Sequence, residues 1–97
     1  MLPPPPDLLA AYCQRHHIRR LSLLGSRSKG SARTDSDLDL LVEFEVDQEP
    51  GLIGLAGMGL ELADLLGGPR VDLPTPEDLS RYFRADVLKQ AEVWYEA

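Results

Sequence analysis

The sequence has few of the residues that mark secreted or membrane-spanning proteins. It contains a single cysteine, Cys13, so no disulfide can form within the chain, and this suits a reducing cytoplasm. The apolar stretch at 51–66 is interrupted by Glu61 and Asp64 and is too short to span a bilayer. The first residues run straight into a proline run without a basic or apolar stretch, so no signal peptide is expected. We therefore expect a cytoplasmic protein that makes no contact with membranes.

An excess of positive charge is also lacking. The chain has 16 acidic and 10 basic residues, and its formal net charge is −6. That balance argues against a general nucleic-acid-binding surface. The charge is uneven, however, since six of the ten basic residues lie between positions 15 and 33 and seven acids follow between 35 and 49. The basic segment suits an anionic substrate, and for Arg15 and Arg20 the alternative of ordinary solvated helix and turn surface stays open.

Apolar periodicity predicts helices alternating with strands in one domain spanning residues 1–97. Residues 1–6 are expected to form a stiff proline-rich arm. The expected helices cover 7–17, 27–32, 58–66 (after a loose start near 51), 76–82 and 84–96, and the expected strands cover 18–24, 37–44 and 70–73. Asp7 is predicted to cap the first helix. Trp94 and Tyr95 are expected on the buried face of the last one. The pattern indicates an α/β (α+β) fold, a small mixed β-sheet with helices packed mainly on one face.

The second expected strand opens with two aspartates, Asp37 and Asp39. Because strand side chains alternate between faces, both carboxylates share the face opposite the apolar residues. Two carboxylates held this close repel each other unless a proton or a cation compensates them. Mg²⁺ is typically held by one or two carboxylates, with water and phosphate oxygens at the remaining positions. The pair therefore predicts a binding site for a metal–triphosphate complex.

A glycine-serine turn connects the first two expected strands. Gly25 permits close backbone approach to a ligand, and Ser26 adds a hydroxyl. A helix starting at Arg27 would point free N–H groups toward the turn and favour an anion there. Arg27 and Lys29 add positive charge. The segment thus predicts a phosphate-binding cradle facing the two aspartates.

The third expected strand contributes one more acid, Asp72. With Val71 and Leu73 directed to the core, Asp72 points to the opposite face. If the strands are neighbours, that face can be the one that carries Asp37 and Asp39. Taken alone, Asp72 is an unremarkable acid at a strand end.

Together these motifs resemble a known family. Gly25-Ser26, followed after ten residues by Asp37-Leu38-Asp39, is similar to the signature of the minimal nucleotidyltransferases of the DNA polymerase β superfamily. The resemblance is closest to the antitoxin half of HEPN/minimal-nucleotidyltransferase toxin–antitoxin pairs. Pro74 departs from the family pattern, where an apolar strand residue is more usual.

The resemblance implies a nucleotidyltransferase fold and a metal-dependent transfer reaction. Asp37, Asp39 and Asp72 would be catalytic and would hold two Mg²⁺ ions, while Gly25 and Ser26 would bind ATP together with Arg27 and Lys29.

The implied partner is a cognate HEPN ribonuclease toxin in a hetero-oligomer, neutralised by transfer of AMP to a tyrosine hydroxyl. The apolar surface of 51–66 would suit such a partner, or it could simply cover the sheet. Two alternatives remain open: an antitoxin that neutralises its toxin by binding alone, and a subunit that modifies a small molecule. No direct nucleic-acid binding is expected.

Overall fold

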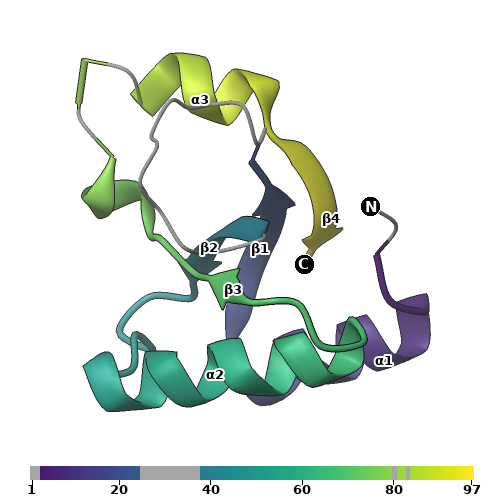
Figure 1. The fold of residues 1–97 in the computed structure, drawn as a ribbon. Coiled ribbons are helices and arrows are strands. Elements are labelled where there is room, and N and C mark those ends of the chain that lie inside the picture. Colours follow the sequence, from purple (N-terminus) through teal and green to yellow (C-terminus); the bar gives the residue numbers. More distant parts are fainter. Residues whose placement is uncertain (1–2, 25–37, 80, 83) are drawn as a thin grey trace.

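The computed structural model describes residues 3–24, 38–79, 81–82 and 84–97. In chain order its elements are α1 (Pro6–Arg15), β1 (Ile18–Leu23), β2 (Leu38–Phe44), α2 (Leu52–Leu65), β3 (Val71–Asp72), η1 (Pro76–Asp78), α3 (Arg84–Gln90) and β4 (Glu92–Glu96). The strands form a sheet of order β3-β2-β1-β4, in which β3 runs parallel to β2 and the other pairs are antiparallel. Helices α1 and α2 lie on one side of this sheet (Figure 1). The expected fold class is therefore confirmed.

The core lies between the sheet and helices α1 and α2. Its buried side chains are Leu9, Tyr12, Cys13, Ile18, Leu21, Leu40, Val42, Met58, Leu62 and Leu73. The hydroxyl of Tyr12 donates a hydrogen bond to the carbonyl oxygen of Met58 at 3.0 Å and so joins the two helices. Burial raises the pKa of the Cys13 thiol to about 12, which agrees with its expected role as a small apolar residue.

Helix α2 is continuous although it contains three glycines. The start expected near residue 51 is confirmed, since the helix begins at Leu52, and the helix is regular from there rather than only from residue 58. Each interior glycine costs about 1 kcal/mol relative to alanine, and the strong helix formers between them offset this cost. The expected end is confirmed: Gly67 and Gly68 follow with φ of 90° and 109°, values that favour glycine.

The last part of the chain is the largest departure from expectation. The predicted helix over 84–96 is wrong beyond Gln90, because residues Glu92–Glu96 form β4 and pair antiparallel with β1. The N–H of Ala97 also donates to the carbonyl of Arg19 at 2.9 Å. Valine and aromatic residues fit a half-buried strand well, and β1 offers an unpaired edge to them. Trp94 and Tyr95 still pack, partly buried, against the core.

Two helix starts also differ from the prediction. Asp7 does not cap α1; Pro5 occupies that position and Asp7 lies in the first turn. Of the described residues of the expected arm, Pro4 is buried, whereas Pro3, Pro5 and Pro6 are exposed. The segment expected as a helix over 76–82 is a single 3-10 turn, η1, with a capping box between Thr75 and Asp78. Among the described residues, no helix is long and apolar enough to cross a bilayer.

Candidate active site

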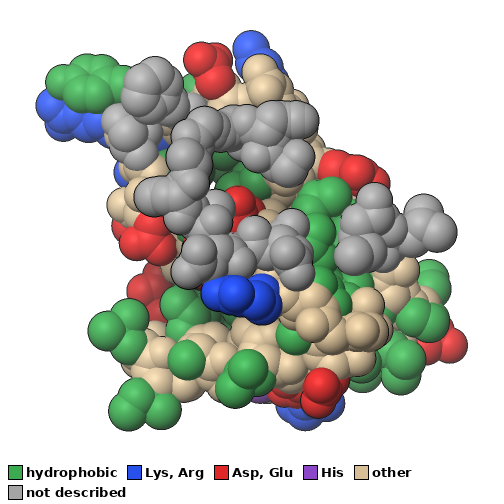
Figure 2. Space-filling view, in the orientation of Figure 1, with side chains coloured by type: hydrophobic (Ala, Val, Ile, Leu, Met, Phe, Trp, Pro, Cys, Tyr) green, Lys and Arg blue, Asp and Glu red, His purple; other side chains and the backbone are tan. Residues whose placement is uncertain are grey.

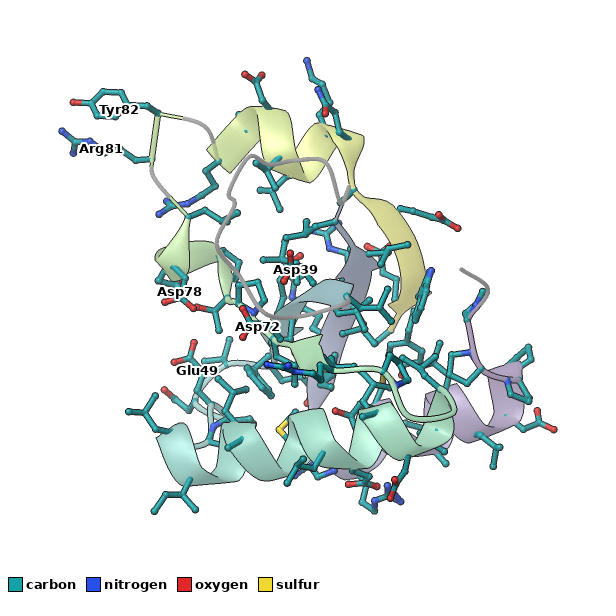
Figure 3. The ribbon with its side chains drawn as sticks, viewed as in Figure 1. Asp39, Glu49, Asp72, Asp78, Arg81 and Tyr82 are labelled. Carbon is teal, nitrogen blue, oxygen red and sulfur yellow. The ribbon has the colours of Figure 1, made fainter. Side chains whose placement is uncertain are left out.

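Two of the three predicted site carboxylates come together at the β2–β3 pair. Asp39 of β2 pairs in register with Asp72 of β3. Adjacent strands lie about 4.8 Å apart, and side chains at paired positions project from the same face of the sheet. Asp39 is half-buried and Asp72 is exposed. Figure 3 shows the two side chains close together at the centre of the view. The condition set by the sequence, that the two strands be neighbours, is therefore met.

Backbone hydrogen bonds tie this pair to the end of β1. The N–H of Leu24 donates to the carbonyl oxygen of Asp39 at 2.9 Å. Leu24 directly precedes the predicted glycine-serine turn, so the chain enters that segment beside Asp39. The predicted cradle residues Gly25, Ser26, Arg27 and Lys29, the carboxylate of Asp37 and the helix expected over 27–32 lie outside the described residues. Their roles remain predictions.

The short strand β3 is anchored at both ends. The N–H of Leu38 donates to the carbonyl of Arg70 at 3.1 Å, and the N–H of Val42 donates to the carbonyl of Pro74 at 2.9 Å. A proline lacks only the backbone donor, so Pro74 extends the ladder as an acceptor. Its departure from the family pattern thus leaves the pairing that positions Asp72 intact.

A neighbouring acid serves a structural role instead. Asp78 lies on the same side of the molecule as Asp39 and Asp72 in Figure 3. Its Oδ2 accepts hydrogen bonds from the N–H of Thr75 at 2.9 Å and from the Thr75 hydroxyl at 3.3 Å. We therefore assign Asp78 to the cap of η1 rather than to the site.

The carboxylate pair suits a hard divalent cation. Among the residues that the structure describes, no group of three or more His, Cys, Asp or Glu side chains could hold a metal. Mg²⁺ needs only one or two protein carboxylates, because water and substrate phosphates complete its shell. Asp39 and Asp72 provide that minimum. The predicted third ligand, Asp37, lies outside the described residues.

A groove that the sequence did not reveal opens beside Asp72. It has a volume of about 920 Å³ and runs between α2 and β3; its lining includes Ala56, Gly59, Leu60, Val71 and Asp72. The sequence indicated only that segment 51–66 had apolar surface to spare. Periodicity could not show that this surface and Asp72 border the same groove.

The other end of β2 is neutralised by arginines. Glu43 is only 8% exposed and accepts a hydrogen bond from Arg19 at 2.9 Å and two from Arg20 at 2.8 and 3.2 Å. Its hydrogen bond raises the pKa of Arg20. Arg20 therefore pairs within the protein, and Arg19 and Arg20 hold β1 and β2 together.

Comparison with known proteins agrees with this geometry. The family model described as a nucleotidyltransferase domain matches residues 6–94. A protein adenylyltransferase MntA of Thermococcus cleftensis is 35% identical over 77 residues, which cover 79% of this chain and 75% of the relative.

Solved structures give the same picture. A structure described as a minimal nucleotidyltransferase is 40% identical, with a TM-score of 0.64 over 89% of this chain and 85% of that chain. A further structure contains a tri-AMPylated HEPN toxin of Shewanella oneidensis in complex with an MNT antitoxin; its matching chain is 18% identical, with a TM-score of 0.63 over 95% of this chain and 70% of that chain. At that identity the last match supports the fold alone.

Proposed function

Since the chain belongs to the nucleotidyltransferase domain family, we propose that it transfers AMP from ATP to a tyrosine hydroxyl of a cognate HEPN toxin and thereby neutralises the toxin. The observation that carries the proposal is the in-register pair of Asp39 and Asp72 at the entry to the predicted cradle. It is supported by a relative named as a protein adenylyltransferase. We place the reaction in the cytoplasm and in a single domain spanning residues 1–97.

The reaction forms one bond and breaks another at the α-phosphorus. The toxin hydroxyl oxygen bonds to the α-phosphorus of ATP, the bond to the bridging oxygen breaks, and pyrophosphate leaves. The hydroxyl proton passes to a base, for which Asp72 is the candidate. Bound Mg²⁺ ions would supply charge neutralisation and an activated attacking oxygen.

Each predicted residue then has a separate task. Asp39, together with Asp37, would hold the metal against the triphosphate. Gly25 and Ser26 would bind the phosphates through backbone N–H groups and the hydroxyl. Asp72 is more exposed than Asp39, which suits a carboxylate that meets an acceptor arriving from outside the chain.

Transfer of label from α-labelled ATP to the co-expressed HEPN protein tests this proposal. We expect the wild-type chain to label the toxin and to abolish its ribonuclease activity. Asp39→Asn removes one charge with little change in shape. This variant should neither label the toxin nor abolish its ribonuclease activity. An unlabelled toxin that wild type and Asp39→Asn silence equally well would instead establish an antitoxin that acts by binding alone. Mass spectrometry of the labelled toxin identifies the acceptor residue.

A further inference from the structure

Helix α2 has apolar residues on two opposite sides. Met58 and Leu62 are buried in the core beneath the helix. Leu52, Ile53 and Leu60 are instead 85%, 90% and 73% exposed, and Figure 2 shows apolar side chains gathered along α2. One side of the helix therefore covers the sheet, and a second apolar side faces solvent.

The exposed side forms one surface, the outer face of α2, made of Leu52, Ile53, Ala56, Gly57 and Leu60. Residues four apart lie in one row along a helix, so Leu52, Ala56 and Leu60 form one row, and Ile53 and Gly57 form the next. All five are exposed. A Cβ atom added at Gly57 would meet nothing within 4 Å. The middle of the face is thus low between larger side chains, a shape that accepts a side chain from a second helix.

Charge marks the two ends of the outer face. No charged residue occurs from Leu52 to Leu60, whereas Glu49 before the face and Asp64 after it are both exposed. A contiguous exposed apolar surface with a polar rim is typical of an interaction site. Complementary charge at such a rim selects the partner. The matching partner carries apolar residues flanked by Lys or Arg.

The same acids argue against two other occupants. A second copy packed antiparallel through this face would bring Asp64 near Asp47 and Glu49, and parallel packing would place each acid against its own copy. Like charges set opposite each other disfavour an interface. An anionic lipid surface would meet these acids too, and such surfaces attract basic segments. The pattern therefore favours a different protein.

The outer face is continuous with the candidate site. Ala56 and Leu60 belong to it and also line the groove that reaches Asp72. A protein bound to α2 would therefore lie beside the carboxylate that receives the proton of the acceptor hydroxyl in the proposed function. This placement suits a partner that is itself the acceptor.

We propose that the outer face of α2 is the docking surface for the partner toxin, which contributes an amphipathic helix with basic residues at both ends of its apolar row. The identity of the partner rests on the proposed function. The inference assigns toxin binding to a surface of α2 that is separate from the predicted triphosphate cradle.

A charge placed on the outer face tests the docking surface. We expect Ile53→Glu to raise the Kd for the purified toxin about tenfold or more, equivalent to about 1.4 kcal/mol, as measured by calorimetry. Because Ile53 is 90% exposed, a thermal melt should match wild type. Tyr82→Glu is the control, at a residue that is 79% exposed and lies far from α2 in Figure 3. It should bind as wild type. An unchanged Kd for Ile53→Glu, or an equal rise in both variants, would overturn the docking surface.

AMP transfer separates this inference from the proposed function. At saturating toxin, Ile53→Glu should transfer AMP at the wild-type rate, because the candidate site is unchanged. Wild-type transfer combined with an unchanged Kd for Ile53→Glu would overturn the docking surface and leave the proposed function standing. A wild-type chain that transfers no AMP, but whose binding to the toxin is weakened by Ile53→Glu, would remove the proposed reaction and support the docking surface.

Charge reversal tests the basic ends of the partner helix. Asp64→Lys should raise the Kd for the toxin about threefold or more at low salt. Glu92→Lys makes the same change in net charge at an exposed residue of β4 and should leave the Kd unchanged. Equal effects of the two variants would show that net charge sets the affinity, and would overturn the assignment of basic residues to the partner.

A photo-crosslinking residue in place of Leu60 identifies the occupant. We expect it to capture a helical segment of the toxin that has Lys or Arg beside its apolar residues. Capture of a second copy of this chain would overturn the inference. So would binding to phosphatidylserine vesicles that Ile53→Glu abolishes.

Discussion

Two acids on the same face of β2 have opposite surroundings. Asp39 and Glu43 are four residues apart, so strand alternation directs them to the same side. Glu43 is buried and accepts hydrogen bonds from Arg19 and Arg20. Asp39 instead has a second carboxylate, Asp72, as its paired neighbour on β3. One end of the strand therefore carries a buried acid held by two arginines, and the other carries an acid whose paired neighbour is a second acid.

The two ends of β2 therefore differ in role: the end with Glu43 supports the sheet, and the end with Asp39 carries the candidate site. Opposite charges placed across neighbouring strands support the sheet, and Arg19, Arg20 and Glu43 do this between β1 and β2. A second carboxylate at the paired position of β3 suits a site that binds a metal–nucleotide complex.

Asp72→Asn gives the largest expected effect, on catalysis. The amide is nearly isosteric but cannot accept a proton, and loss of a positioned base costs about 10²–10⁴-fold in rate. We expect AMP transfer to fall about a hundredfold or more, with the toxin still bound. The free energy of unfolding should be unchanged, because Asp72 is exposed and the amide is nearly isosteric. Wild-type transfer by this variant would exclude a catalytic role for Asp72.

Glu43→Gln should show the reverse pattern. Arg19 and Arg20 lose their shared carboxylate, so the free energy of unfolding should fall by about 1–3 kcal/mol. The transfer rate at a temperature where the protein is folded should stay at the wild-type value. Chemical denaturation measures the first quantity. The control is Glu45→Gln at an exposed residue just beyond β2, for which no measurable loss is expected.

Mg²⁺ should stabilise the end of β2 that carries Asp39. At a concentration ten times its dissociation constant, a ligand stabilises the folded state by about 1.4 kcal/mol, which raises the melting temperature of a domain of this size by about 6–11 °C. We expect this shift for wild type and for Glu43→Gln but not for Asp39→Asn. A thermal melt with and without Mg²⁺ measures it. Equal shifts in all three proteins would place the ion elsewhere.

Glu96→Gln sharpens the comparison with the smallest effect. Glu96 of β4 contacts the same arginine, Arg20, at 3.5 Å, but its side chain is 52% exposed. Exposed ion pairs contribute about 0–1 kcal/mol. We expect a loss below about 0.5 kcal/mol in chemical denaturation. A loss as large as that of Glu43→Gln would show that burial does not set the difference between the two acids.

Much of the sheet could be predicted because strand signals are local. The apolar run after Asp39 and the run from Ile18 each form a strand with bounds close to those expected. The final segment shows the limit of this method. Residues 92–96 satisfy a helical apolar pattern and a strand pattern alike, and the open edge of β1 decided between them.

The sequence by itself determined which residues face the same side within each strand, because alternation is a property of the extended backbone. It also determined where α2 ends, since Gly67 and Gly68 adopt positive φ at little cost. The tertiary structure decided that β3 lies parallel to β2, which brings Asp72 beside Asp39. It also placed α2 along the outer edge of β3 and so formed the groove. Neighbour choice depends on how distant segments pack together, and no local period in the chain encodes it.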